Sequence, residues 1–350
     1  MQTYSHPALG IDIGGTNCKA GLVDEKGNVI DHTAFQINHK AGIDAFLHSL
    51  YVSIDRLIDG RNIRRNIFRR NIFRRRIPRL TRRLSRPLSR RKVCGIGVLL
   101  PGYLKENRTI PSIMVNIPML ENAPFYRLLS ERYDVHVALD IDRNGPCMAE
   151  YLFCYKNRAF RLMYVTIGTG VGVGLCINGE ICRISGDSIG ELGHLTLEPD
   201  GYPCVCGNRG CVETIVSIRG IARIADRLGV TERIMPQKAA GGRKNPNGSD
   251  ALIPEAVYRK ALEGDENARR VYREFSRYLG AALVTYANIF SPDLIVIGGG
   301  LAGASDLYID IAQQYLNEHW FERKTKQILV RKTSFGEHAG IVGAASLVLP

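Results

Sequence analysis

Near its start the chain reads Gly10-Ile11-Asp12-Ile13-Gly14-Gly15-Thr16-Asn17-Cys18-Lys19, with apolar runs on both sides of a double glycine. This pattern predicts two strands joined by a tight turn, that is, a β-hairpin. Glycines leave backbone N–H groups open to phosphate oxygens, and Asp12 would orient a hydrated Mg²⁺. A plain hairpin turn, which two glycines also permit, explains these residues equally well when they are taken alone.

A second glycine-rich turn follows a later apolar strand, in the segment Thr166-Ile167-Gly168-Thr169-Gly170-Val171-Gly172-Val173-Gly174. Its glycines alternate with small or β-branched residues, so this turn also suits a close approach to phosphate. A dinucleotide-binding loop would open a helix, whereas here another apolar strand follows. The pattern therefore disfavours nicotinamide chemistry.

The length of 350 residues, with 45% apolar and 23% charged residues, indicates two lobes rather than one core. We expect a small α/β lobe at 1–137, joined by a C-terminal helix at about 338–350, and a large α/β lobe at 138–337. Each lobe contains a glycine-turned hairpin, so we expect small ligands to bind in a cleft between the lobes. Periodic apolar positions predict helices at 42–59, 124–132, 145–155, 214–228 and 254–290.

The cellular compartment is indicated by what the sequence lacks. Eighteen consecutive apolar residues occur nowhere, and residues 1–7 have no apolar leader. The nine cysteines show no spacing typical of a disulfide framework. These features predict a cytoplasmic protein.

The basic charge of the chain is concentrated in one segment, residues 61–91, which holds fourteen arginines and no acidic residue. These arginines account for the whole formal net charge of +13. The segment contains a tandem repeat, Arg64-Arg65-Asn66-Ile67-Phe68 followed by Arg69-Arg70-Asn71-Ile72-Phe73. We interpret it as a tolerated insertion, with an arm that contacts nucleic acid or an anionic membrane surface as the alternative.

Asp142 follows an apolar strand at 135–141 and precedes Asn144 at the entry to a helix. A carboxylate at such a strand end can accept a hydroxyl proton during phosphoryl transfer, because an ordinary aspartate is ionised at neutral pH. Capping of the helix by Asp142 or Asn144 is the competing explanation.

A metal site is predicted by the spacing of four residues, His194, Cys204, Cys206 and Cys211. Three thiolates and one imidazole make a closed tetrahedral Zn²⁺ site, which is structural because no ligand position is left open. Reduced surface cysteines are the alternative. Glu191 and Glu213 flank the predicted zinc loop at 194–211 and would accept hydrogen bonds from sugar hydroxyls, unless they are ordinary surface glutamates.

Taken together, these motifs resemble the ROK family of sugar kinases and sugar-responsive repressors, within the actin/hexokinase-like ATPase superfamily. The most specific elements are Glu191-Leu192-Gly193-His194 and Cys204-Val205-Cys206-Gly207-Asn208-Arg209-Gly210-Cys211-Val212-Glu213. The resemblance implies a two-lobed α/β fold of the ribonuclease H-like class with an interlobe cleft and a zinc-binding loop.

The resemblance also implies roles for individual residues. Asp142 would be the base that deprotonates the sugar hydroxyl, and Glu191, His194 and Glu213 would hold the sugar ring, with Asn116 and Gly102 in a further sugar loop. Ile141 occupies the place where most family kinases have a sugar-binding asparagine, so we expect altered selectivity. The residues that would bind ATP and Mg²⁺ are Asp12, Gly14, Gly15, Thr16, Lys19, Gly168, Thr169, Gly170, Gly298, Gly299 and Gly300.

The family contains both kinases and repressors, and its repressors carry a helix-turn-helix domain before the first phosphate turn. Eleven residues precede Asp12, so we expect no DNA-binding domain. We therefore expect an ATP-dependent kinase, a homodimer by resemblance, that phosphorylates the 6-hydroxyl of a hexose. Glucose, N-acetylmannosamine, N-acetylglucosamine, allose and fructose remain open as substrates. A catalytically idle sugar-binding regulator is the alternative from another class.

Overall fold

The computed structural model describes residues 6–59, 93–231 and 252–349, apart from Glu106, Asn157 and Ser185. The arginine tract at 61–91 lies outside the described residues. The chain divides into two compact units, Met1–Asp140 with Ala344–Pro350 and Ile141–Gly343. Within the described ranges, no helix is both long enough and apolar enough to cross a membrane.

The first unit is built on a five-stranded sheet in the order β3-β2-β1-β4-β7. β1 (Ala8–Ile13) pairs antiparallel with β2 (Asn17–Val23) and parallel with β4 (Gly95–Leu100). β3 (Val29–Gln36) and β7 (His136–Ile141) form the two edges. The register of β1 on β2 confirms the hairpin predicted from the opening sequence.

Two helices, α1 (Gly42–Asp59) and α2 (Phe125–Tyr133), contribute to the apolar core of this unit. α1 buries Phe46, Leu50 and Leu57 on one face, as helical periodicity requires. The remaining short elements are β5 (Leu104–Lys105), β6 (Ile110–Pro111) and the 3₁₀-helix η1 (Pro118–Leu120).

The end of the chain packs back on the first unit. α11 runs over Ala339–Ser346, and its carbonyl at Ala344 lies against Gly97 in the centre of β4. A β-carbon at position 97 would overlap that carbonyl. Gly97 therefore allows the two backbones to approach closely.

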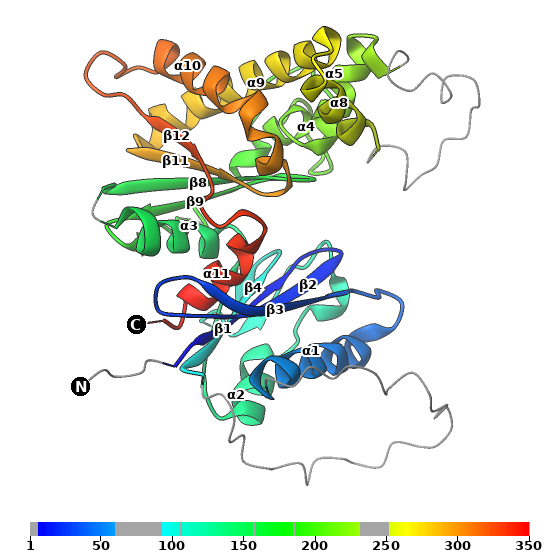
Figure 1. Ribbon diagram of the computed structural model, residues 1–350, viewed down its shortest axis with the longest axis vertical. Helices are drawn as coiled ribbons and strands as arrows, with labels where there is room; N and C mark the ends of the chain where they lie inside the picture. Colours follow the sequence, from blue (N-terminus) through cyan, green and yellow to red (C-terminus); the bar gives the residue numbers. More distant parts are fainter. Residues whose placement is uncertain are drawn as a thin grey trace. The chain divides into compact units, whose positions relative to one another are not determined.

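The second unit has its own five-stranded sheet, in the order β10-β9-β8-β11-β12 (Figure 1). β8 (Arg161–Ile167) and β9 (Val171–Ile177) form the predicted second hairpin. β11 (Leu294–Gly298) runs parallel to β8 and to β12 (Leu329–Lys332), and the two-residue β10, Glu180–Ile181, completes the edge.

Helices cover both faces of this second sheet, with α9 and α10 on one side and α3 on the other (Figure 1). The largest apolar core of the chain lies between the sheet and the α9 side. The helices are α3 (Asn144–Glu150), α4 (Val212–Ile215), α5 (Ile218–Arg227), α8 (Leu252–Leu262), α9 (Glu266–Phe290) and α10 (Ile309–His319). The short helices are η2 (Tyr151–Tyr155), η3 (Leu192–His194), η4 (Gly300–Leu307) and η5 (Gly336–His338).

Three predicted helices are shorter than the sequence indicates. The helix expected at 145–155 becomes a π-helical turn after Glu150. The helix expected at 214–228 breaks at Ser217, whose extended backbone and side-chain oxygen cap α5 by accepting from the Gly220 N–H. The helical stretch expected at 254–290 is divided by Asp265, which caps α9 through the Ala268 N–H.

Gly97→Ala should destabilise the protein by about 1–3 kcal/mol, because the added methyl overlaps the Ala344 carbonyl in a packed region. Urea unfolding measures the effect. Gly303→Ala is the matched control, since a β-carbon there meets no atom within 4 Å, and it should change stability by less than about 0.5 kcal/mol. Equal effects of the two substitutions would contradict the packing described here.

Candidate functional site

The first glycine turn is held by backbone hydrogen bonds on both of its sides. The Gly14 N–H donates to the Asn17 carbonyl at 2.9 Å, and the Ile37 N–H donates to the Thr16 carbonyl at 2.8 Å. Asp12 lies opposite Lys19 in the register of β1 and β2, and both are partly buried. The predicted phosphate-binding residues of the first unit therefore sit on one fixed hairpin.

The predicted sugar loop meets this hairpin within the same unit. A β-carbon on Gly15 would lie 3.4 Å from the Asn116 Cβ. Asn116 is exposed between the buried side chains of Met114 and Ile117, which fix the loop to the core. Gly102 has φ +132° beside the Ile113 carbonyl, a position that excludes other residues.

The second glycine turn contacts two further segments of the second unit. The Gly168 carbonyl accepts from the Ile218 N–H at 2.8 Å. Gly298 pairs with Thr166 in the sheet, and a β-carbon on Gly168 would lie 4.0 Å from the Gly300 backbone nitrogen. The structure thus brings residues 168–170 and 298–300 together, as a shared phosphate- or nucleotide-binding region requires.

Glu213 joins this glycine turn to the cysteine-rich loop. Its Oε2 atom accepts a hydrogen bond from the Val171 N–H at 3.1 Å. A side chain at Gly170 would overlap the same oxygen, so only glycine permits this approach. Cys211 is the N-cap residue of α4, the helix that carries Glu213, which links the carboxylate directly to the predicted metal ligands.

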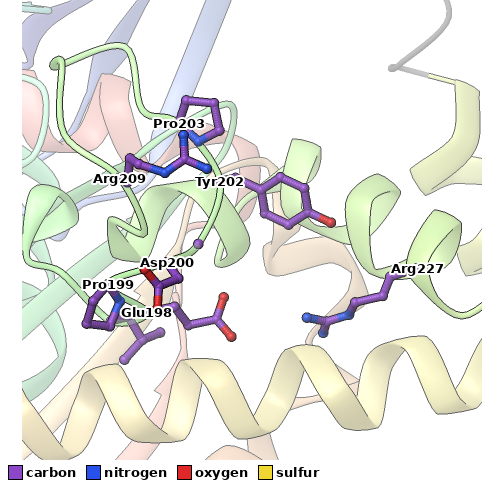
Figure 2. Close-up of a pocket in the computed structure, with 9 residues that line it drawn as sticks. Glu198, Pro199, Asp200, Tyr202, Pro203, Arg209 and Arg227 are labelled. Carbon is purple, nitrogen blue, oxygen red and sulfur yellow. The ribbon is translucent and has the colours of Figure 1, made fainter.

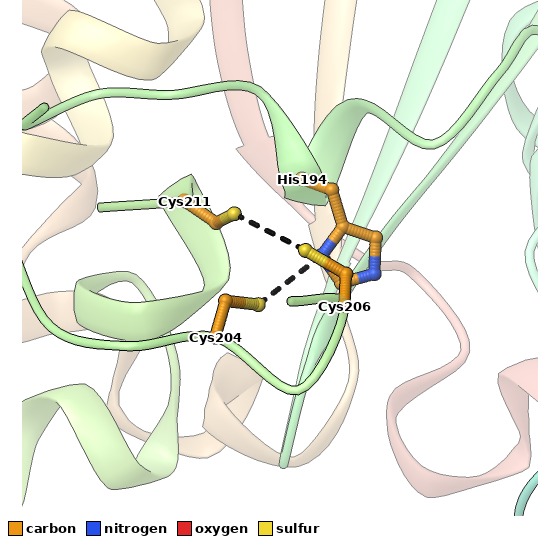
Figure 3. Close-up of side chains that lie close together, drawn as sticks. All are labelled: His194, Cys204, Cys206 and Cys211. Carbon is orange, nitrogen blue, oxygen red and sulfur yellow. Dashed lines mark hydrogen bonds between the residues drawn. The ribbon is translucent and has the colours of Figure 1, made fainter. Parts of the chain in front are cut away.

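The four predicted metal ligands converge, and their ligand atoms all lie within 4.8 Å of one another (Figure 3). The Cys204 Sγ is 3.5 Å from the His194 Nδ1, and the Cys206 Sγ is 3.6 Å from the Cys211 Sγ. Tetrahedral ligands at 2.3 Å from Zn²⁺ are separated by roughly 3.8 Å. The donor set and its spacing therefore fit a structural zinc ion.

The thiols of this cluster have different environments. The backbone N–H of Asn208 lowers the pKa of the Cys206 thiol, whereas burial raises the pKa of Cys211. A bound Zn²⁺ would displace the proton from each of them, because the thiolate is the ligand. Zinc binding should therefore release protons.

Asp142 lies between β7 and α3 and is partly buried. Burial raises its pKa, the Arg143 guanidinium opposes this shift, and the Glu191 carboxylate adds to it, so the pKa lies above the ordinary aspartate value.

The N-cap residue of α3 is Arg143, which makes no side-chain capping bond, and the Asn144 amide donates to the Asp187 carbonyl at 2.7 Å. Ile141, just before Asp142, is fully buried.

Arg143 is a site residue that sequence reasoning missed. Its Nη2 atom lies 2.6 Å from the Glu191 Oε1, and its side chain is only 10% exposed. The sequence does show a basic residue, Arg143, directly after the acidic residue Asp142 at the end of a predicted strand. The pairing partner could not be read from the sequence, because Glu191 lies on a different segment.

A pocket of about 660 Å³ is lined by residues between 197 and 209 together with Arg227 (Figure 2). Two of its charged groups have close partners: Tyr278 Oη donates to Glu198 Oε1 at 2.5 Å, and Arg227 pairs with Glu274 at 2.7 Å. Its lining contains none of the predicted site residues and consists of Leu197, Glu198, Pro199, Asp200, Gly201, Tyr202, Pro203, Arg209 and Arg227. We assign it no catalytic role.

The chain belongs to the ROK family, whose model matches residues 75–350. A glucokinase from Halalkalibacterium halodurans is 29% identical over 341 residues, covering 97% of this chain and 94% of that protein. The DNA-binding transcriptional repressor Mlc of Escherichia coli is 27% identical over 255 residues, covering 73% of this chain and 60% of that protein.

Among solved structures, the ROK glucokinase of Streptomyces griseus in complex with glucose and AMPPNP matches with a TM-score of 0.73. Its sequence is 25% identical, and the match covers 97% of this chain and 98% of that one. The α/β fold of this chain is therefore that of the actin/hexokinase-like ROK kinases, as the sequence predicted.

Purified protein should contain one zinc ion per chain, measured by elemental analysis. Cys206→Ser should weaken zinc binding by more than the roughly 10–100-fold that loss of an outer hydrogen-bond partner costs, and the apoprotein should unfold at a lower temperature. Cys94→Ser is the matched control, because Cys94 is an exposed thiol outside the cluster. Full zinc content in Cys206→Ser would count against the assignment of this ligand.

Proposed function

We propose that this chain is an ATP-dependent sugar kinase that transfers the γ-phosphate of ATP to the 6-hydroxyl of a hexose. The observation that supports this most strongly is the placement of Asp142. Its partly buried carboxylate has a raised pKa and sits in the unit that also holds the second glycine turn and Glu191, His194 and Glu213. The similarity to glucokinases extends over 97% of the chain.

In this proposal the glycine turns bind the phosphates of ATP. Backbone N–H groups of Gly15 and Thr16 in the first turn, and of Thr169 and Gly170 in the second, would donate to phosphate oxygens. The N–H groups of Gly14 and Gly168 instead hold the two turns, by bonding to the carbonyls of Asn17 and Gly170. Gly298–Gly300 would lie at the adenosine end. Asp12 would orient hydrated Mg²⁺, and Lys19 would add positive charge nearby. The metal, when bound, neutralises the charge that accumulates on the transferred phosphoryl group.

In this proposal, two carboxylates, an imidazole and an amide would recognise the sugar. Glu191 and Glu213 would accept hydrogen bonds from ring hydroxyls, and His194 would add an imidazole contact. Asn116 and Gly102 would contribute a second loop. Glu213 keeps acceptor capacity for this role, since a carboxylate accepts several hydrogen bonds and one is to Val171. Ile141 offers no hydrogen bond, so the identity of the hexose stays open.

Asp142 would take the proton from the attacking hydroxyl. A base with a raised pKa binds that proton more strongly than an ordinary aspartate does. Since only the ionised form can act, kcat should fall as the pH drops through the pKa of Asp142.

A catalytically idle sugar-binding regulator is the second candidate, because repressors such as Mlc also match this chain. The distinction is chemical: only the kinase releases ADP when sugar is added. We also expect a homodimer and a cytoplasmic location, on the strength of the family resemblance.

Wild-type protein should release ADP with at least one sugar of a panel comprising glucose, N-acetylmannosamine, N-acetylglucosamine, allose and fructose. A coupled assay with ATP and Mg²⁺ measures the rate. Binding of a panel sugar by calorimetry without any ADP release would favour the regulator instead.

Asp142→Asn should lower kcat by about 10²–10⁴-fold, because the amide cannot accept the hydroxyl proton. Sugar affinity, measured by calorimetry, should change little, since the substitution preserves shape. Asp310→Asn is the control: Asp310 is exposed on α10 and its loss should leave kcat unchanged. Full turnover in Asp142→Asn would remove Asp142 from the mechanism.

A further inference from the structure

The Arg143 side chain is largely buried within the second unit and is paired there with a carboxylate. Its backbone is the N-cap of α3, directly after Asp142. Its side chain is 10% exposed, although arginine is rarely buried in proteins unless it is paired. The Nη2 atom lies 2.6 Å from the Glu191 Oε1, the distance of a charge-assisted hydrogen bond.

The stem of Arg143 lies against β9 at a point where the strand carries glycine. A β-carbon on Gly172 would lie 3.3 Å from the Arg143 Cδ and 3.5 Å from its Cβ. The first of these contacts is tighter than packed side chains normally make and the second is an ordinary van der Waals contact, so a residue with a side chain at position 172 would press against the arginine. The path of the side chain toward Glu191 is therefore determined by packing as well as by charge.

Glu191 needs such a partner. It precedes the short helix η3, and its side chain is 37% exposed, so packing alone does not fix its rotamer. A glutamate side chain loses substantial conformational entropy when it is held in one orientation. An acceptor that is fixed before the sugar arrives does not incur this cost during binding.

We propose that Arg143 is a positioning residue of the sugar site, which holds the Glu191 carboxylate in the orientation that receives the substrate hydroxyls. This inference rests on the proposed function, in which Glu191 binds sugar. Arg143 acts through Glu191 and needs no contact with the sugar itself. Lysine would not replace it fully, because an ammonium is a point charge without the planar donor fork of arginine.

The pair also acts electrostatically on the neighbouring base. The positive charge of Arg143 lowers the pKa of Asp142, and the negative charge of Glu191 raises it, while burial is the largest influence. Removal of Arg143 should therefore raise the pKa of Asp142, and removal of the Glu191 charge should lower it.

The test compares Arg143→Met, Glu191→Gln and the double variant, using the sugar that the panel identifies. Arg143→Met should raise the sugar KM about tenfold, a typical coupling for residues in direct contact. In the Glu191→Gln background the same substitution should have a smaller further effect, because a neutral amide has already replaced the charged partner of Arg143. Arg227→Met is the matched control, since Arg227 forms a 2.7 Å pair with Glu274 away from the site, and it should leave KM unchanged.

The pH dependence of kcat separates positioning from general stability. Arg143→Met should move the acid limb to higher pH, because Asp142 loses a cation, and Glu191→Gln should move it to lower pH, because Asp142 loses an anion. Arg143→Lys should restore the acid limb while KM stays elevated. A purely structural role predicts shifts in neither variant, or in the same direction in both.

The inference is overturned if Arg143→Met leaves KM and the acid limb unchanged, or if its effect on KM is as large without Glu191. Wild-type protein that binds a panel sugar without ADP release would contradict the proposed function alone. In that case the single and double variants are compared by their sugar Kd, measured by calorimetry, and the same coupling between Arg143 and Glu191 is expected. Absence of both binding and turnover across the panel would overturn both proposals.

Discussion

The arrangement of carboxylates in the second unit depends on close contacts at three glycines, two with backbone carbonyls and one with a carboxylate. A side chain at Gly193 would overlap the Val171 carbonyl, and one at Gly210 would overlap the Glu198 carbonyl. The third contact places Glu213 against Gly170. These contacts fix the two ends of the segment that carries the cysteine and histidine ligands, and with them the positions of Glu191 and Glu213.

The metal cluster and the glycine contacts serve the same purpose. Residues between His194 and Cys211 form no regular secondary structure apart from isolated bridges such as Thr196 with Cys211. Leu195, Leu197 and Tyr202 pack this loop against the core, and a metal ion held by the four converging side chains would constrain it further. Loss of order there would affect the second glycine turn through Glu213, and the surroundings of Asp142 through Glu191 and Arg143.

Much of this could be predicted from the sequence, because the signals are local. Glycine turns between apolar runs gave both hairpins, and thiol spacing gave the converging ligand set. The break at Ser217 was missed because apolar periodicity continues across it while a single side-chain cap interrupts the helix. The pairing of Arg143 with Glu191 was missed because it joins segments far apart in sequence.

The fold does not distinguish a kinase from a repressor, or one sugar substrate from another. Kinases and repressors share the fold, and the similarity of this chain extends to both. Ile141 is buried at the position where the family resemblance implies a sugar-binding asparagine, and its side chain would offer no hydrogen bond there. The chemistry of the product therefore carries more information about this protein than further comparison of folds.

The most direct test of the account is phosphorus–proton correlated NMR of the product formed from ATP and an accepted hexose. The account predicts a phosphomonoester whose phosphorus couples to the two protons on carbon 6. A phosphate on the anomeric carbon, or ATP hydrolysis to free phosphate with no ester at all, would contradict it.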